Sequence, residues 1–399
     1  MKGLFSESVS RAAKPLPTMI PRCDHCGLYK GCQTPKMAPS GLGRKRILVV
    51  GDHPGYTEDE RGEQFLGDSG RWLEKELRRV GISLRGDCVM TNAAICRGAD
   101  RHRSAVVDCR PNLIRTLNEV NPVLVLLFGG SAVKSLIGHL WQTEDVGAVA
   151  RWVNWQIPAH KPNCWVAPFH NPAYLLREAN AALDGEFRRG LEAAVARTDR
   201  PWPDGPPDYS RYVELIYDPI EAADRIRSYK DGVIAFDFET TCLKPDGPAA
   251  DIVCCSVCWN GEETIVFPWH GEAVAAMKEL LEDDAVSKIG ANSKFEHRWT
   301  FRKLGINVRG WVWDTVLAAH SLDSRRGVTG VKFQSFVRLG VPDYAAAVKR
   351  FLESDRKGGN EPNRIGEISV EQLWRYCGLD SLLEYEVAQD QMREMGLST

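Results

Sequence analysis

Two acidic side chains in the second half of the chain have a spacing that suits metal binding. Asp237 and Glu239 lie two residues apart in an apolar, strand-like segment, so their carboxylates leave the same face and can meet one cation. The same spacing also suits an edge strand that carries two solvated acids. Farther along, Tyr376 and Asp380 lie four residues apart and would share one face of a helix.

Four cysteines form two pairs that suit a metal site. Two residues separate Cys23 from Cys26, and Cys96 and Cys109 follow far downstream. Four thiolates could bind an Fe-S cluster or zinc, and the spacing does not choose between the two. The first 20 residues lack the apolar run of a secretory signal, so we expect a reducing, cytoplasmic location in which thiols bind metals.

The composition is that of a globular protein with an uneven distribution of charge. At about 150 residues per domain, 399 residues correspond to two or three domains. No apolar run reaches the roughly 18 residues of a membrane span, so we expect no membrane contact. Residues 1–200 carry 28 Lys and Arg against 21 Asp and Glu, whereas residues 201–399 carry 23 against 32. A basic half suits a polyanionic partner, and an acidic half suits bound cations.

The hydrophobic pattern predicts an α/β protein with two domains. In the first domain, strands are expected at 44–52, 88–96 and 122–130, and helices at 69–81 and 108–120. This alternation predicts a mostly parallel sheet that is covered on both faces. Residues 200–215 contain four prolines and break every regular pattern, so we expect domains at 1–199 and 216–399 joined by this linker.

The second domain is expected to begin with consecutive strands. These strands are predicted at 232–240, 252–259 and 262–269, and mainly helical segments follow them. Cys254, Cys255 and Cys258 lie in the second of these strands, and we interpret them as small buried side chains rather than ligands.

Residues 230–390 resemble the DEDD superfamily of exonucleases with tyrosine in the third motif, and above all the proofreading 3'-5' exonuclease domain of family A DNA polymerases. The resemblance rests on "NSKFE" ending at Glu296, on "DT" at Asp314 and on "YCGLD". It implies an RNase H-like fold with a mixed sheet. The family usually has aspartate where this chain has Glu296, and we expect Asp314 to brace or cap the structure.

This first resemblance also implies site residues and cofactors. Two Mg2+ or Mn2+ ions would be held by Asp237, Glu239, Glu296 and Asp380. Tyr376 would orient the attacking water, and Asn292 and Lys294 would contact DNA. Two such ions can stabilise the charge that develops on the attacking and leaving oxygens.

Residues 20–195 resemble the uracil-DNA glycosylase superfamily, specifically its Fe-S-containing family 4. The resemblance rests on "VVGDHPG", "VMTNAAICR", "VLLFGGSAVKSLIG" and "FHNPAYLLRE". It implies a three-layer fold with a parallel sheet and a [4Fe-4S] cluster on Cys23, Cys26, Cys96 and Cys109. Cys32 would be left out of the cluster, although its thiol could substitute for one of the four ligands.

The same resemblance implies roles in base excision. Asp52 and His53 would belong to a catalytic loop that positions water, and Phe65 would stack on the extruded base. Asn92 would read the edge of the base, and His170 would stabilise the oxyanion of the leaving pyrimidine. Phosphate contacts would come from Arg97, Arg101 and Arg103.

Two motifs of the first domain depart from the family pattern. Family 4 usually reads Gly-Glu-Ala-Pro-Gly where this chain has Gly-Asp-His-Pro-Gly at 51–55. The last motif usually has histidine directly before proline, whereas Asn171 stands between His170 and Pro172 here. Either this loop carries an insertion, or Asn171 takes the catalytic position.

Together the two resemblances predict a DNA replication or repair protein. The arrangement resembles the front portion of certain phage family A polymerases. It implies single-stranded 3' ends and uracil or another modified base as substrates, a separate polymerase chain as partner, and the cytoplasm of an infected bacterium as location. Two other classes stay open, a base-excision enzyme and a non-catalytic DNA-binding accessory subunit, with RNA as a lesser substrate variant.

Overall fold

The computed structural model describes residues 21–261, 263–354 and 359–397. Residues 1–20, in which no secretory signal is expected, and the first position of the strand predicted at 262–269 lie outside these residues. The described chain consists mainly of two compact units, residues 21–207 and residues 208–335 with 343–397. Over these ranges, we find no helix with both the length and the apolar character needed to cross a lipid bilayer.

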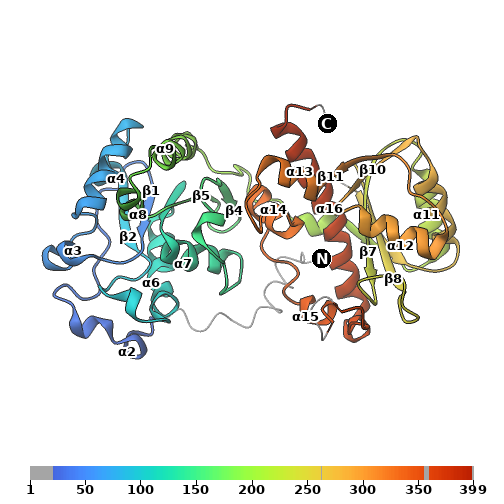
Figure 1. Ribbon diagram of the computed structural model, residues 1–399, viewed down its shortest axis with the longest axis horizontal. Coiled ribbons are helices and arrows are strands. Elements are labelled where there is room, and N and C mark those ends of the chain that lie inside the picture. Colours follow the sequence, from blue (N-terminus) through green and yellow to red (C-terminus); the bar gives the residue numbers. More distant parts are fainter. Residues whose placement is uncertain (1–20, 262, 355–358, 398–399) are drawn as a thin grey trace. The chain divides into compact units, whose positions relative to one another are not determined.

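A five-stranded sheet forms the centre of the first unit, in the order β2-β1-β3-β5-β4 (Figure 1). Its strands are β1 (Ile47–Gly51), β2 (Cys88–Asn92), β3 (Leu124–Phe128), β4 (Ile157–Ala159) and β5 (Cys164–Phe169). All neighbours are parallel except β4, which runs antiparallel to β5. The predicted, mostly parallel sheet is therefore confirmed, with three of its strands at the predicted places.

Helices cover both faces of this sheet. They are α2 (Cys23–Cys26), α3 (Tyr56–Arg61), α4 (Asp68–Arg79), α5 (Leu84–Asp87), α6 (Ala105–Val120), α7 (Gly130–Leu140), α8 (Pro172–Glu178) and α9 (Ala181–Val195). Leu124 and Leu126 of β3 pack with apolar side chains of α4, α8 and α9. The alternate residues Val125 and Leu127 are also fully buried, so they face α6 and α7 on the other side.

The second unit contains a six-stranded mixed sheet in the order β11-β10-β7-β8-β9-β6. Its strands are β6 (Val213–Leu215), β7 (Gly232–Thr240), β8 (Ile252–Trp259), β9 (Glu263–Pro268), β10 (Val286–Gly290) and β11 (Trp311–Asp314). β8 is antiparallel to β7 and β9, and the other pairs are parallel. β6 lies within the stretch predicted as linker, and β10 and β11 lie in the part expected to be mainly helical.

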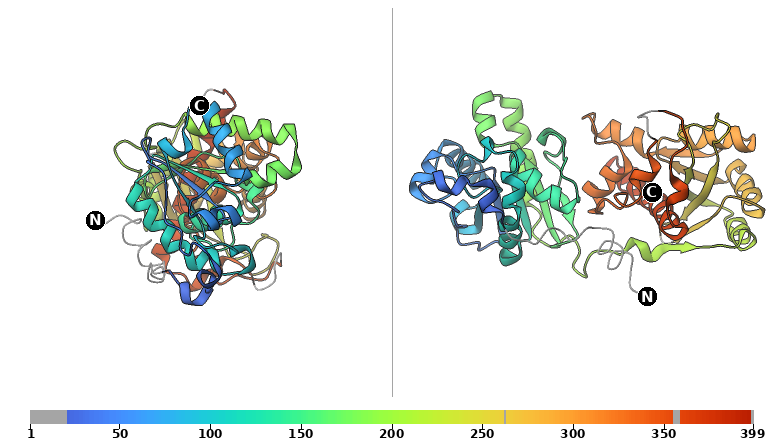
Figure 2. Two further views of the ribbon diagram at one scale, coloured as in Figure 1. Left: turned by 90° about the vertical axis from the view of Figure 1, so that its left-hand side faces the viewer. Right: turned by 90° about the horizontal axis from the view of Figure 1, so that it is seen from below.

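One long helix crosses one face of the mixed sheet. The helices are α10 (Pro219–Ser228), α11 (Glu272–Glu282), α12 (Lys294–Leu304), α13 (Thr315–Leu322), α14 (Val331–Leu339), α15 (Lys349–Leu352) and α16 (Val370–Glu394). α16, dark red in Figures 1 and 2, lies on one side of the strands, and α11 and α12 lie on the other. Phe236 and Phe238 of β7 pack into the core beneath α10 and α11. The alternate residues Asp237 and Glu239 therefore point toward α16.

A glycine allows α16 to approach the sheet closely. A β-carbon added to Gly378 would lie 2.4 Å from Cγ1 of Val213 and 2.8 Å from Cγ2 of Val266. Both distances are too short for a methyl group, so the backbone of α16 can rest on β6 and β9 only without a side chain here.

We predict that Gly378→Ala lowers the free energy of unfolding by about 1–3 kcal/mol, because the added methyl group must push α16 away from the two valines. The measurement is urea denaturation followed by circular dichroism. The control is Gly366→Ala, where a β-carbon meets open space, and its effect should stay within about 0.5 kcal/mol. Equal stability of Gly378→Ala and the unchanged protein would show that the contact is not tight.

Candidate functional sites: a carboxylate centre, a thiol pocket and a strand-end cluster

The end of β7 brings two carboxylates to the face below α16. Asp237 and Glu239 alternate with the buried Phe236 and Phe238, as the two-residue period of a strand requires. Cys377 of α16 lies next to them: Asp237, Glu239 and Cys377 each offer a ligand atom, and these three atoms lie within 4.8 Å of one another. This neighbourhood of a thiol was not foreseen from the sequence.

α16 is held in place directly beside this pair. Ser256 of β8 donates a hydrogen bond from its hydroxyl to the backbone carbonyl of Cys377, at 2.8 Å. Tyr376 and Asp380 lie on the same helix, one turn apart, and both are largely buried. The helix predicted for the third motif is therefore present, and its polar residues face β7.

Asp380 is bound by two groups that the sequence analysis missed. The ammonium group of Lys332 on α14 lies 2.6 Å and 2.7 Å from its two carboxylate oxygens, and the hydroxyl of Tyr344 donates to one of them at 2.5 Å. Lys332 also lies 4.9 Å from the centre of the Tyr376 ring. One cation thus joins the carboxylate and the tyrosine of the third motif.

Glu296 is positioned by Asp314. Asp314 accepts hydrogen bonds from the backbone N–H groups of Asn292 and Ser293, just before α12, and caps α13 by accepting from Val316 and Leu317. The expected bracing and capping role of Asp314 is therefore confirmed. Glu296 follows in the first turn of α12 and is buried.

The carboxylates are close enough to raise one another's pKa. Burial and then the charge of Asp380 raise the pKa of Asp237 to about 8. Burial raises the pKa of Glu239 and of Glu296 well above the usual range, and the charge of Asp237 adds to both effects. Divalent cations would reverse these shifts because they stabilise the ionised forms. The donor set is all-oxygen apart from Cys377, so it fits Mg2+ or Mn2+.

A fifth acidic residue, Glu384, lies in the same region and was not predicted. It follows Asp380 by four residues on α16 and is 3% exposed. Burial raises its pKa well above the usual range, and the charge of Glu296 makes the largest contribution of any neighbouring group. By contrast, the predicted DNA-contacting residues Asn292 and Lys294 are exposed at the start of α12.

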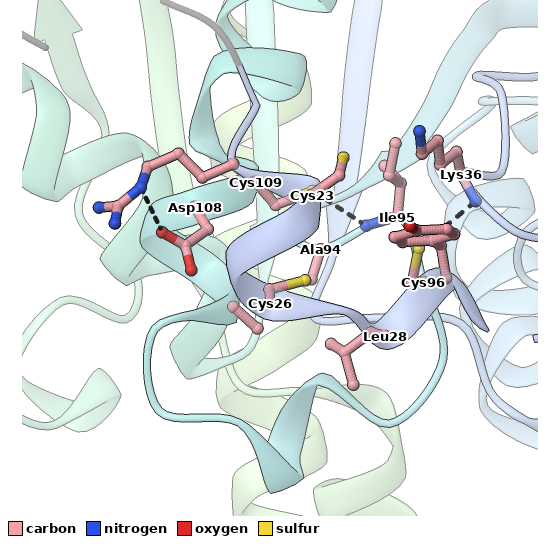
Figure 3. A pocket seen from close by; sticks show the side chains of 12 residues that line it. Cys23, Cys26, Leu28, Lys36, Ala94, Ile95, Cys96, Asp108 and Cys109 are labelled. Atoms are coloured by element: carbon pink, nitrogen blue, oxygen red, sulfur yellow. Dashed lines mark hydrogen bonds and ion pairs between the residues drawn. The ribbon is translucent and has the colours of Figure 1, made fainter. Parts of the chain in front are cut away.

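In the first unit, four cysteines surround one pocket (Figure 3). Cys23 and Cys26 come from α2, Cys96 follows β2, and Cys109 comes from α6. Leu28, Ala94, Ile95 and Ala105 line the same pocket with apolar side chains. Cys32 does not line it, and its thiol instead donates to the backbone carbonyl of Leu28 at 3.3 Å.

The thiols of this pocket receive backbone hydrogen bonds. The N–H of Lys36 donates to the sulfur of Cys96, and the N–H of Ile95 donates to that of Cys109, both at 3.4 Å. Burial raises the pKa of Cys96 to about 12, and the hydrogen bond from Lys36 opposes this effect. N–H donors and an apolar shell are the features that tune Fe-S clusters. The four thiols and their apolar, hydrogen-bonding surroundings therefore fit a thiolate-bound Fe-S cluster.

The other predicted residues of the first unit gather where the parallel strands end. Gly51 ends β1 and Asn92 ends β2, and these two residues are paired in register. A β-carbon on Gly51 would lie 2.5 Å from Oδ1 of Asn92 and 3.0 Å from Cζ of Phe65, so the missing side chain of Gly51 leaves room for the amide and the ring at the end of β1. In α/β sheets, ligands bind at this carboxyl end of the strands.

Hydrogen bonds of Asp52 and Asn171 connect the segments that follow β1, β3 and β5. Oδ1 of Asp52 accepts hydrogen bonds from the backbone N–H groups of Ser131 and Ala132 at the start of α7. Its Oδ2 accepts from the side-chain amide of Asn171 at 2.7 Å, while Asn171 also caps α8 by accepting from Ala173. Both carboxylate oxygens and both ends of the Asn171 amide thus have structural partners. These hydrogen bonds were not predicted from the sequence.

The remaining predicted residues lie around this edge. His170 directly precedes Asn171, and its ring lies 5.1 Å from that of Tyr174. His53 lies 3.7 Å from the carboxylate of Asp100. In the basic loop, Arg97 lies 3.4 Å from Asp59, whereas Arg101 and Arg103 are exposed.

Comparisons with known proteins identify two families in one chain. Residues 40–194 match the uracil DNA glycosylase superfamily, and residues 213–395 match a 3'-5' exonuclease family of the type found in family A DNA polymerases. A type-4 uracil-DNA glycosylase of Pyrobaculum aerophilum is 31% identical over 183 residues, which cover 44% of this chain and 89% of the relative. DNA polymerase I of Chloroflexus aurantiacus is 26% identical over 274 residues, 66% of this chain but 27% of the polymerase.

Among solved structures, the Nibbler EXO domain of Aedes aegypti matches 47% of this chain and 92% of its own, with a TM-score of 0.34 and 16% identity. The mixed sheet with its α/β surroundings confirms the predicted fold class of the second domain. Through its N-terminal half the chain belongs to the type-4 uracil-DNA glycosylases, and a 3'-5' exonuclease domain follows in the same chain.

Proposed function

We propose that this protein shortens DNA from the 3' end at the carboxylate centre and excises uracil at the carboxyl ends of the parallel strands in the first unit. The observation that carries the proposal is the convergence of buried acids from β7, α12 and α16, three elements that lie far apart in the sequence. Burying several ionised carboxylates together is unfavourable, and bound cations would offset their repulsion. DNA rather than RNA is favoured because the adjoining domain belongs to a family of DNA glycosylases.

In the nuclease centre, Asp237, Glu239, Glu296 and Asp380 would hold two Mg2+ or Mn2+ ions. When bound, the ions would stabilise charge on the attacking and leaving oxygens of the phosphodiester. Burial and the charge of Asp380 raise the pKa of Tyr376 well above its usual range, so its hydroxyl stays protonated and can orient a water molecule. Lys332 places a positive charge beside Asp380 and holds it in position.

At the strand ends of the first unit, Phe65 would stack on an extruded uracil and Asn92 would hydrogen-bond its edge. Asn171 already caps α8 and binds Asp52, so His170 is the better candidate to stabilise the leaving pyrimidine. Asp52 would position the loop at 51–55 rather than react, and His53 would line that loop. Arg97, Arg101 and Arg103 would contact phosphates.

Cys23, Cys26, Cys96 and Cys109 would hold a [4Fe-4S] cluster. A bound cluster would fix α2 and α6 to the segment after β2, because these elements supply the four thiolates. The adjacent loop with Arg101 and Arg103 would thereby be held for DNA.

A separate DNA polymerase is the partner that a proofreading-type nuclease implies, because it would supply the 3' ends to be trimmed. The main alternative function is that of a non-catalytic DNA-binding accessory subunit. Such a protein would show salt-dependent DNA binding without either activity.

We predict that Mg2+ supports the 3'-end shortening of a 5'-labelled single strand and that Asp237→Asn slows it at least about 100-fold, because the variant removes a metal-binding charge. Gel analysis of the products measures the rate. The control Asp231→Asn changes an exposed acid just before β7 and should leave the rate unchanged. Persistent shortening by Asp237→Asn would place the nuclease activity elsewhere.

We predict that uracil-containing DNA acquires alkali-labile sites in the presence of EDTA, and that Asn92→Ala reduces their formation roughly 10- to 100-fold through loss of base hydrogen bonds. The same oligonucleotide with thymine should stay intact. Asn180→Ala, at the exposed start of α9, should retain excision. If unchanged protein leaves uracil in place, the first unit has another role.

We predict that anaerobically purified protein contains iron and absorbs visible light, and that Cys96→Ser loses both, because one cluster ligand is missing. Iron analysis and the absorption spectrum measure the loss. Cys32→Ser should keep both signals, since the Cys32 thiol contacts a backbone carbonyl rather than the pocket. Zinc in place of iron would overturn the cluster assignment.

A further inference from the structure

Two buried carboxylate oxygens at the nuclease centre lack hydrogen-bond partners. Within the described part of the chain, Oε2 of Glu296 and Oε1 of Glu384 are buried and receive no donor. The two residues are only 4% and 3% exposed, so these oxygens are shielded from bulk solvent. An unpaired buried carboxylate oxygen is costly, and a native protein that keeps two of them requires an explanation.

The two residues come from different elements but act on each other electrostatically. Glu296 lies in the first turn of α12, and Glu384 lies on α16, one turn after Asp380. The charge of Glu296 is the largest contribution of any neighbouring group to the raised pKa of Glu384. Two like charges that raise each other's energy would be stabilised together by one positive charge between them.

The other acids of the centre have other neighbours. Both oxygens of Asp380 contact Lys332, and one of them also accepts from Tyr344. Asp237 and Glu239 lie together with Cys377 within 4.8 Å, a spacing that suits a single cation. Glu296 and Glu384 are then the remaining pair of oxygen donors at the centre.

We propose that Glu384 is a fifth carboxylate of the metal centre and that it binds, together with Glu296, one of the two divalent cations. The proposal rests on the nuclease function proposed above. It also accounts for glutamate at position 296, because an oxygen donor from α16 can share the cation with the longer side chain. Carboxylate oxygens from two helices suit Mg2+ or Mn2+.

A purely structural alternative makes a different prediction. If Glu384 were protonated and donated a hydrogen bond to Glu296, a glutamine at position 384 could donate in the same way. The variant Glu384→Gln would then bind metal as the unchanged protein does. A ligand role requires instead that loss of the charge weakens the binding of one cation.

The test is calorimetric titration of the full chain with Mn2+. We expect two binding events in the unchanged protein, and a rise of at least about tenfold in the Kd of one of them in Glu384→Gln, the size of effect that altered metal surroundings produce. Glu384→Asp keeps the charge but withdraws the oxygen by one methylene, so it should weaken the same event. Thermal unfolding in EDTA checks that both variants fold.

Two further variants complete the design. Glu371→Gln removes an exposed acid of the same helix that pairs with Arg375, and it should bind Mn2+ like the unchanged protein. Glu296→Gln should weaken the same event as Glu384→Gln, and the double variant should lose less than the two single losses combined, because both residues would bind one ion.

The outcomes separate this proposal from the nuclease function. Weakening of one event by Glu384→Gln, with the other intact, supports the fifth carboxylate. If both Mn2+ binding events are unchanged in Glu384→Gln and Glu384→Asp but Asp237→Asn loses Mn2+ binding, the role of Glu384 is overturned. The metal centre itself then stands. Unchanged binding by Asp237→Asn would overturn the metal centre itself.

Discussion

The mutual repulsion of carboxylates buried between β7 and α16 is the constraint on which the second unit depends. The period of β7 sends Asp237 and Glu239 to one face, and α16 places Asp380 against them. Burial and the neighbouring charges raise the pKa values of the first two. Burial is the largest single effect on Lys332 and would lower its pKa, but the charge and hydrogen bond of Asp380 and the charges of Asp237 and Glu239 together outweigh it. The pKa of Lys332 is therefore raised, and this lysine stays charged. One ammonium group cannot balance so many acids, and the centre therefore suits further cations.

Groups that repel one another stay together only if the surrounding structure holds them. Gly378 lets α16 rest directly on β6 and β9, and Ser256 binds the backbone of α16 beside the site. Asp314 fixes the start of α12 through hydrogen bonds to the backbone and so places Glu296. These contacts use small side chains and backbone groups, which lose little conformational freedom on ordering. The positions of the acids are thus set before any ion binds, as a preorganised site requires.

Local periodicity was sufficient to predict β7 and the helix of the third motif. It failed for β10, because Lys288 interrupts the apolar pattern although its side chain is fully buried and donates to the carbonyl of Asp283. Glu384 could have been found by extending the four-residue spacing of α16 by one turn. No sequence signal marks Lys332, because it reaches Asp380 from a separate helix, and contacts between distant segments leave no local pattern.

The two proposed centres make opposite electrostatic demands, and this difference accounts for the uneven charge of the chain. A leaving pyrimidine is an anion, so a carboxylate without hydrogen-bond donors beside it would oppose its departure. Asp52, the acid of the loop at 51–55, has its oxygens bound by the start of α7 and by Asn171, which disperses its charge into backbone and amide dipoles. The nuclease centre instead leaves carboxylate oxygens without donors, so that cations can bind them. These demands account for a basic glycosylase half and an acidic nuclease half in one chain. The glycosylase half must attract the phosphate backbone without bound metal ions, whereas cations in the nuclease half can do so.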